Sequence, residues 1–220
     1  MMVWVGLGSN LGDRDKNLSL ARELCARISC LPLLESSIYE TPAWGGVAQE
    51  PFLNQVIGFV VDQSALHSFI QRELTLLDVE LGKEVLSESE RSWWRVRISQ
   101  AKTLESDCDR SCERLASSTM LALLLIERRC GRDRSHHALR WASRTIDLDL
   151  LAVTNDDQNG LIVDNSLLTL PHPRLQERDF VLTPWAELAP SLLIPKHNAS
   201  VRELSDSLVI VGDPPKHHPT

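Results

Sequence analysis

The sequence lacks the features of a membrane or secreted protein. Its longest apolar run, Met120 to Ile126, has only seven residues, whereas a membrane-spanning helix needs roughly 18 to 20. The first residues contain no basic stretch, long apolar segment or cleavage site, so no secretory signal is predicted. The five cysteines are an odd number, which favours free thiols in a reducing compartment. We expect a cytoplasmic protein without a membrane partner. The alternative is a location in an organelle, if the chain belongs to a longer eukaryotic protein.

Positive charge and aromatic residues are also scarce. The 220 residues include 23 Lys and Arg against 30 Asp and Glu, a net charge of −7, with one Tyr and four Phe. A protein that binds nucleic acid by bulk electrostatics needs a basic surface, and a sheet that binds RNA needs aromatic residues on its strands. No nucleic-acid partner is therefore predicted. The remaining composition, 43% hydrophobic and 24% charged, is typical of one globular domain.

Apolar spacing predicts six elements of secondary structure separated by turn residues. In chain order they are a strand over 3–7, a helix around 18–28, strands over 33–39 and 53–61, a helix over 64–81 and a strand over 144–153. This order is that of the split βαβ, or ferredoxin-like, arrangement. We therefore expect the α+β class, with an antiparallel βαββαβ sheet, helices on one face and the other face left for loops and ligands.

Residues 84–140 interrupt this pattern and are interpreted as a long insertion before the last core strand. The segment has 11 Lys and Arg against 9 Asp and Glu, and it is rich in Ser and charge up to Gln100. Such a composition buries little apolar surface, so we expect most of the insertion to be mobile without ligands and the sheet not to need it. The apolar part near Leu121 to Ile126 is expected to stay packed against the domain or a partner. One helix is predicted inside it, over about 112–129. The domain would span residues 1–211, followed by a linker-like tail over 212–220.

The sharpest chemical motif is Asp147-Leu148-Asp149. In a strand, residues i and i+2 point to the same face about 6.5 to 7 Å apart, so two carboxylates in this pattern can hold Mg²⁺ or bridge two ions. Arg144, three residues earlier, adds a cation beside the pair, which suits a metal-bound polyphosphate. The competing interpretation is a solvated strand face on which acids alternate with apolar residues.

The segment Arg140 to Leu151, RWASRTIDLDLL, resembles the signature of the 6-hydroxymethyl-7,8-dihydropterin pyrophosphokinase family of folate biosynthesis. Four further segments are similar to the family, namely Gly8 to Gly12, Tyr39 to Gly45, Phe52 to Asn54 and Leu170 to Phe180. The family fold is ferredoxin-like, which agrees with the prediction from apolar spacing.

The resemblance implies transfer of the β,γ-pyrophosphoryl unit of ATP to the hydroxymethyl oxygen of the pterin, with release of AMP and with two Mg²⁺ ions as cofactors. It implies catalytic roles for Asp147, Asp149, Arg144 and Arg140, with both metal ions on the two aspartates. It implies ATP contacts for Asp78, Lys83, Trp141, Arg144, Thr169, His172 and Arg178. It implies pterin contacts for Thr41, Pro42, Trp44, Phe52, Asn54 and Phe180.

In the family, a loop before the aspartate strand closes over ATP and carries arginines. Arg132, Arg134 and Arg140 are the candidates for that role here. A loop that brings cations over a polyphosphate moves on and off during turnover. We therefore expect the stretch from Arg132 to Trp141 to order when ATP and pterin are bound.

Several positions depart from the family pattern, and two other functions stay open. Asp78 stands where the family usually has Glu, Lys83 where Arg is usual, Pro173 where some members have Tyr and Leu167 where some have Arg. Lys keeps the charge but loses the bidentate phosphate contact, so these differences bear on ATP affinity. One alternative is a catalytically weak or structural domain of a larger folate enzyme, and a less favoured one is a ferredoxin-like RNA-binding module. Fusion to dihydropteroate synthase, known in some eukaryotes, is a further hypothesis.

Overall fold

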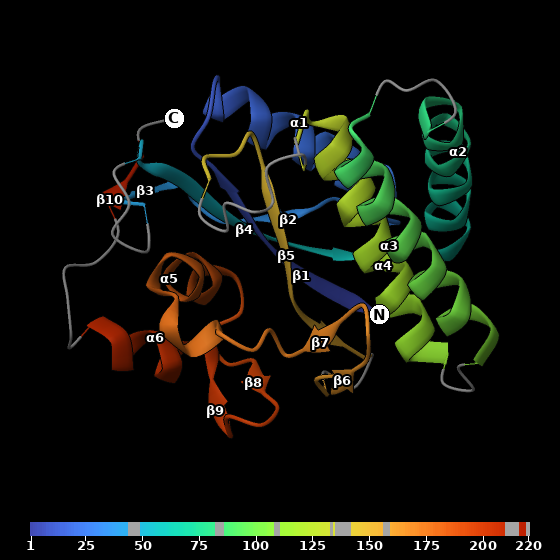
Figure 1. The fold of residues 1–220 in the computed structure, drawn as a ribbon. Helices are drawn as coiled ribbons and strands as arrows, with labels where there is room; N and C mark the ends of the chain where they lie inside the picture. The colour runs from blue at the N-terminus through green and yellow to red at the C-terminus, as the bar shows by residue number, and fades with distance from the viewer. Residues whose placement is uncertain are drawn as a thin grey trace.

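The computed structural model describes residues 1–43, 49–81, 86–107, 111–132, 134, 142–155, 159–209 and 216–218. The chain begins with β1 (Met2–Ser9), α1 (Arg14–Ala26), β2 (Leu34–Glu35), β3 (Tyr39–Thr41), β4 (Phe52–Val60) and α2 (Gln63–Leu81). There follow α3 (Glu88–Asp107), α4 (Ser111–Arg129) and β5 (Asp147–Thr154). The remainder comprises β6 (Val163–Asp164), β7 (Thr169–Leu170), a 3-10 turn (Leu175–Glu177), α5 (Asp179–Leu188), β8 (Leu193–Ile194), β9 (Ala199–Ser200), α6 (Val201–Val209) and β10 (Lys216–His217) (Figure 1).

An antiparallel sheet in the order β10-β3-β4-β1-β5 forms the centre of the domain, and β2 also pairs with β4. The predicted combination of an antiparallel sheet with helices is confirmed. The central strand β1 pairs with β4 on one side and with β5 on the other. This register sets Gly8 opposite both Asn54 and Asp147, and Gly6 opposite Asp149. Residues far apart in the sequence are thereby brought into one row across the sheet.

Helices cover both faces of the sheet. On the first face, Val3 and Leu7 belong to the main core with residues of α1, α2 and α4. On the second face, Trp4 and Val56 pack with residues of α5 and α6 around the buried Trp185, and Figure 1 shows these two helices well apart from α2, α3 and α4. The prediction of helices on one face only is therefore wrong. Strands β1 and β4 are buried along almost their whole length, and strands of this kind need a layer on each face.

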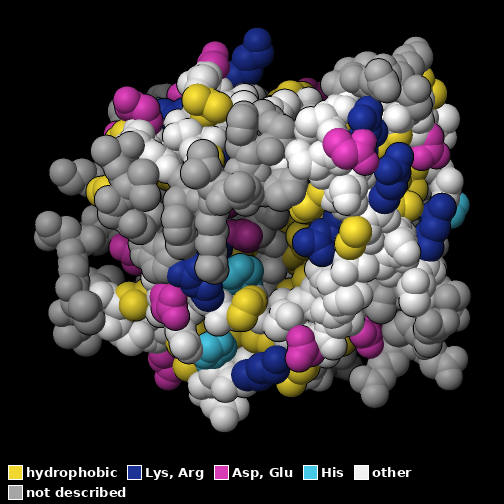
Figure 2. Space-filling view, in the orientation of Figure 1, with side chains coloured by type: hydrophobic (Ala, Val, Ile, Leu, Met, Phe, Trp, Pro, Cys, Tyr) yellow, Lys and Arg dark blue, Asp and Glu magenta, His cyan; other side chains and the backbone are white. Residues whose placement is uncertain are grey.

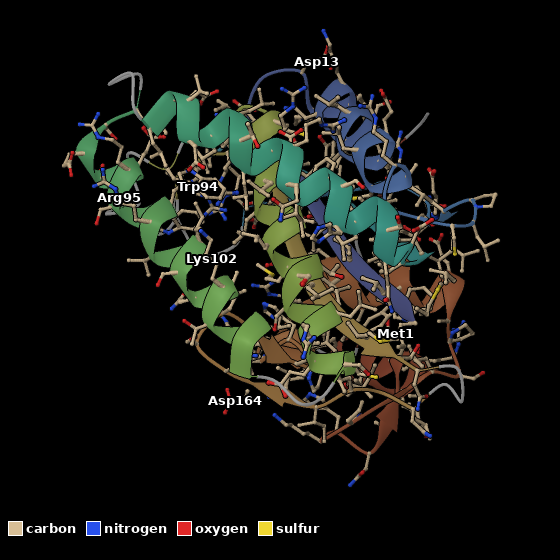
Figure 3. The ribbon with its side chains drawn as sticks, turned by 90° about the vertical axis from the view of Figure 1, so that its right-hand side faces the viewer. Met1, Asp13, Trp94, Arg95, Lys102 and Asp164 are labelled. Atoms are coloured by element: carbon tan, nitrogen blue, oxygen red, sulfur yellow. The ribbon has the colours of Figure 1, made fainter. Side chains whose placement is uncertain are left out.

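The helix predicted inside the insertion is confirmed as α4. Its residues Leu123, Leu125 and Ile126 are fully buried, and the helix contacts α1, α2 and β5. The apolar part of this helix is packed against the domain, as predicted. The expectation that the sheet does not need the insertion is wrong for this helix, because α4 supplies part of the main core. Helix α3, which the composition did not predict, packs on α4. In Figure 3 its Trp94 lies between the helices, where it is buried, while Arg95 points outward.

The described residues also bear on the predictions about membrane helices, cysteines and the tail. No helix among them is long and apolar enough to cross a membrane. The four cysteines that are described, Cys25, Cys30, Cys112 and Cys130, are free thiols, as predicted. Two residues of the tail that was predicted to be linker-like form β10 and pair with β3 at the edge of the sheet.

Candidate active site

A pocket with about 740 Å³ of empty space, open to solvent, lies on the second face of the sheet, between β1, β4, β5 and the start of α5. Nine residues predicted for the site line it: Thr41, Pro42, Phe52, Asn54, Arg144, Asp147, Asp149, Arg178 and Phe180. In Figure 2, acidic, basic and histidine side chains gather near the middle of the view, where β5 passes in Figure 1. The fold therefore assembles most of the predicted site in one place.

Two glycines of β1 form the floor of this pocket. A Cβ atom at Gly8 would lie 3.2 Å from Asn54 Oδ1 and 3.4 Å from Phe52 Cδ1. A Cβ atom at Gly6 would lie 3.4 Å from a methyl group of Leu151. Glycine in a strand interior commonly marks a place where another group approaches the backbone closely. The floor is thus made of main chain, and it separates the carboxylates of β5 from the aromatic end of β4.

The charged half of the pocket, defined here as Arg144, Asp147, Asp149 and Arg178, is built around the two aspartates. The predicted site residue His172 is not among the described residues that line the pocket, but it lies next to Asp149. Asp147 Oδ2 accepts a hydrogen bond from Arg144 Nη1 (2.9 Å), and its Oδ1 accepts one from Arg132 Nη1 (2.9 Å). Burial acts to raise the pKa of Asp147, but the guanidinium groups of Arg132 and Arg144 outweigh it and hold the pKa below its usual range. Asp147 is therefore a carboxylate anion with cations on both oxygens.

Asp149, two residues further along β5 on the same face, is also paired with a cation. Arg178 Nη1 donates to Asp149 Oδ2 (2.5 Å), and His172 Nε2 lies 3.9 Å from Asp149 Oδ1. Burial lowers the pKa of His172, although the charge of Asp149 acts in the opposite direction. The backbone N–H of His172 donates to the carbonyl of Leu151 (2.9 Å), which fixes this residue to β5.

A buried carboxylate that the sequence interpretation missed supports Asp147 from the helical side. Glu127 of α4 is only 2% exposed; its Oε1 accepts the backbone N–H of Leu148 (2.9 Å) and its Oε2 an N–H of Arg134. Arg132 Nη1, which binds Asp147, is 3.7 Å from Glu127 Oε1. Burial raises the pKa of Glu127, and Arg134 and Arg132 oppose that effect. Arg134 also stacks on Trp93 of α3, with its Cζ 4.1 Å from the ring centroid.

The neutral half of the pocket, defined here as Thr41, Phe52, Asn54 and Phe180, contains no charged side chain. Asn54 is buried and its Nδ2 donates to Thr41 Oγ1 (2.8 Å), which fixes the orientation of the amide. Phe52 begins β4 and Phe180 lies in the first turn of α5. Both rings line the pocket while remaining partly accessible. This half offers apolar surface together with one oriented amide.

Asn10, which follows the end of β1, links the segments that precede β4 and β5 through hydrogen bonds. The side-chain amide of Asn10 donates to Gln49 Oε1 (3.1 Å) and Ser143 Oγ (3.3 Å), and its Oδ1 accepts the backbone N–H of Arg144 (2.8 Å). Gln49 and Arg144 both line the pocket. Asn10 therefore holds two parts of the pocket wall in place through one side chain.

The other predicted site residues lie away from the pocket surface or outside the described part of the chain. Asp78 is exposed on α2 and is not among the described residues that line the pocket. Thr169 lies on β7 and donates to Asp164 Oδ1 (3.1 Å) rather than lining the pocket surface that the structure describes. Four predicted residues lie outside the described part of the chain: Trp44, Lys83, Arg140 and Trp141. The expected ordering of 132–141 also falls mostly on residues that are not described.

A carboxylate pair framed by arginines, next to an aromatic surface, is suited to phosphoryl transfer onto a flat substrate. The model of the family 7,8-dihydro-6-hydroxymethylpterin-pyrophosphokinase (HPPK) matches residues 4–107 and 103–190. The chain belongs to this family of pyrophosphokinases, which confirms the resemblance inferred from the sequence.

Individual relatives agree with the family assignment. The 2-amino-4-hydroxy-6-hydroxymethyldihydropteridine pyrophosphokinase of Methylorubrum extorquens is 31% identical over 193 residues, 87% of this chain and 85% of that protein. The protein of the same name from Porphyromonas gingivalis is 30% identical over 87% of this chain and 92% of its own length. That from Aquifex aeolicus is 26% identical over 91% and 88%. A solved HPPK-DHPS in complex with substrates has a TM-score of 0.41 and 12% identity, covering 95% of this chain and 43% of its own.

Proposed function

We propose that this protein transfers the β,γ-pyrophosphoryl group of ATP to the hydroxymethyl oxygen of 6-hydroxymethyl-7,8-dihydropterin and releases AMP. Membership of the pyrophosphokinase family supports the reaction. The observation that carries the proposal in the structure is a single pocket with a carboxylate pair at one end and two aromatic rings at the other. Each end matches the chemistry of one substrate.

The charged half fits divalent metal ions bound together with ATP. Asp147 and Asp149 present carboxylate oxygens, the hard ligands that Mg²⁺ prefers, and Mg²⁺ commonly uses one or two carboxylates and completes its coordination with water and phosphate oxygens. We infer that these two aspartates hold two Mg²⁺ ions. Bound ions of this kind neutralise the charge that develops on the transferring phosphates.

The arginines of the charged half would orient the polyphosphate. Arg144 and Arg178 line the pocket, and each already binds one aspartate oxygen. A guanidinium group has five N–H donors in a fixed fork, so one arginine can bind an aspartate oxygen and phosphate oxygens at the same time. Arg132 holds Asp147 from the helical side. In this arrangement the positions of both aspartates are fixed before the substrate arrives, as electrostatic catalysis requires.

The neutral half would hold the pterin. A pterin ring is flat, and aromatic side chains bind such rings through offset or edge-to-face contacts, so Phe52 and Phe180 would contact its faces. The amide of Asn54, oriented by Thr41, would pair with the donors and acceptors of the ring edge. The hydroxymethyl oxygen would then lie over the glycine floor, facing the charged half.

We further propose that β1, α1, β3, β4, α4 and β5 form a ferredoxin-like core, in which α4 takes the place of the second helix. The strand order β3-β4-β1-β5 with antiparallel pairing supports this assignment. The contacts of α4 with β5 and α1 support the place of the helix. Helices α2 and α3 would then be additions packed on the outside of α4.

A product assay tests the proposed reaction. The protein is incubated with ATP, Mg²⁺ and 6-hydroxymethyl-7,8-dihydropterin, and nucleotide products are separated by chromatography. We expect AMP and pterin pyrophosphate in equal amounts, with no product when the pterin or the Mg²⁺ is omitted. Formation of ADP would indicate transfer of a single phosphoryl group and would contradict the proposal.

A further inference from the structure

The tail strand β10 covers the outer edge of the sheet beside the neutral half of the pocket. It pairs antiparallel with β3, which places His217 opposite Tyr39. The backbone N–H of the next residue, His218, donates to the carbonyl of Ile38 (2.8 Å). Without β10, β3 would be an edge strand, and edge strands present a row of unpaired backbone groups. The tail therefore supplies backbone partners that β3 otherwise lacks within the described sheet.

Three side chains, Tyr39, Glu187 and His217, join the tail to the body of the domain. The buried Tyr39 hydroxyl donates to Glu187 Oε1 of α5. Burial and this carboxylate raise the pKa of Tyr39, so the hydroxyl keeps its proton. Because a phenol has only one hydrogen to donate, the contact of 3.1 Å between His217 Nε2 and the Tyr39 oxygen is a hydrogen bond donated by His217. The two rings are also in contact, with centroids 4.4 Å apart and planes tilted by 39°.

The same edge is tied to α1. The imidazole Nε2 of His218 lies 3.6 Å from Asp15 Oδ1 in the first turn of that helix. The preceding residue, Arg14, donates to Glu40 Oε1 and to the carbonyl of Pro51, both at 2.8 Å. Strand β3 is thus held between the tail, α1 and the start of β4.

This edge leads directly into the neutral half. Tyr39 is two residues before Thr41, which ends β3, lines the pocket and accepts the hydrogen bond of Asn54. Glu187, the partner of Tyr39, belongs to α5, the helix that carries Phe180 into the pocket. Tyr39 therefore connects the strand and the helix that support the neutral half, and the tail holds Tyr39 from the outside.

We propose that residues 216–218 are positioning residues for the pterin: by closing the edge of β3, they keep Thr41 and Phe180 at the spacing that binds a flat ring. The proposal rests on the function proposed above. It concerns affinity for the pterin and leaves the charged half unaffected, because the contacts of the tail lie on β3, α5 and the first turn of α1.

Two variants test this role. One ends after residue 209, and the other is the full chain with His217→Ala. His67→Ala, which changes an exposed histidine on α2, is the matched control. Dissociation constants for 6-hydroxymethyl-7,8-dihydropterin and for Mg²⁺-ATP are measured separately by calorimetry. We expect pterin binding to weaken about three- to tenfold in both variants, the effect of losing roughly one net hydrogen bond, while ATP binding and the control stay unchanged.

Rescue by an added peptide separates positioning from general stability. A synthetic peptide of residues 210–220, added to the truncated protein, is expected to restore pterin affinity toward that of the full chain. It is also expected to slow hydrogen exchange at residues 39–41. A merely structural role of the tail would instead lower the midpoint of thermal unfolding and weaken both ligands equally, which would overturn the proposal.

The remaining outcomes are equally decisive. Unchanged pterin affinity in His217→Ala and in the truncated protein overturns the positioning role; if the truncated protein does not fold, His217→Ala decides alone. If hydrogen exchange at residues 39–41 is unchanged after truncation, the tail does not close the edge of β3, and the proposal is overturned. Absence of pterin binding by the unaltered full chain overturns the proposed function instead, so the two failures are distinguishable.

Discussion

The two halves of the pocket are held in place in different ways. In the charged half, arginines bind both aspartates: Asp147 is bound by the nearby Arg144 and by Arg132, and Asp149 by Arg178. Asp147 is also linked through Arg132 to the buried Glu127. In the neutral half, the buried Asn54 donates a hydrogen bond to Thr41, and the partly buried ring of Phe180 packs against the core of the second face. We therefore expect a change in the charged half to affect α4 as well, whereas a change in the neutral half should affect only the nearby edge of the sheet.

The largest effect should follow from removing a charge at the aspartate pair. Asp147→Asn or Asp149→Asn is expected to lower turnover by at least about a hundredfold, because a lost metal ligand removes several kcal/mol of charge stabilisation. Asp206→Asn, an exposed aspartate on α6, is the control. Initial rates with Mg²⁺ as the only metal, together with thermal unfolding of each variant, give the comparison. Near-normal turnover in either variant would rule out the metal-binding role.

Glu127, which lies behind the charged half, is expected to contribute mainly to the stability of the fold. Glu127→Gln keeps the acceptor for the Leu148 N–H but leaves the guanidinium group of Arg134 without its carboxylate, so we expect a loss of about 3 kcal/mol in the free energy of unfolding. Glu23→Gln, which breaks an exposed pair with Arg27, should cost less than about 1 kcal/mol. Urea unfolding measures both. Equal losses would show that Glu127 is not the centre of a buried network.

Loss of one aromatic ring from the neutral half should lower the affinity for the pterin more than the affinity for ATP. Phe180→Ala is expected to weaken pterin binding by about 1 to 3 kcal/mol, by analogy with base stacking on aromatic side chains, and to change ATP binding much less. Calorimetry with each ligand alone is the measurement. Equal losses for both ligands would mean that Phe180 acts as a core residue.

The smallest effect is expected at the contact between Trp93 of α3 and Arg134, the arginine that binds Glu127. Trp93→Leu removes the ring under Arg134 and should cost about 0.5 to 1 kcal/mol of stability, the contribution of an accessible cation–π contact. A double-mutant cycle with Arg134→Gln isolates this contribution. If Trp93→Leu has the same effect with and without Arg134, the stacking contact is not its cause.

Periodic and motif-based predictions succeeded where a pattern is local. The Asp-Leu-Asp alternation predicted that both acids share one face of a strand, and both line the pocket. The helix predicted over about 112–129 is α4, whose start differs by one residue. Such patterns depend on neighbours in the sequence, so they can be interpreted without knowing the fold.

The failures concern contacts between distant segments. Helix α3 is so rich in charge that its buried positions, Trp94 and Ala101, give only a weak apolar stripe. The resemblance implied an ATP contact for Asp78, in the helix before the insertion, but the described lining of the pocket does not include Asp78. The structure instead packs α4 against β5 and sets Glu127 behind the aspartates. No spacing rule shows which of two helices reaches a strand, because that choice is made by packing.

The glycine floor limits the mutations by which an organism could become resistant to an inhibitor bound in this pocket. A molecule resting on Gly6 and Gly8 touches main chain, which substitutions elsewhere in the sequence cannot remove. Any side chain added at Gly8 would press on Asn54 and Phe52, the same groups that the natural substrate would use. An inhibitor that places its bulk on this floor would therefore leave the organism few escape mutations that do not also impair its own enzyme.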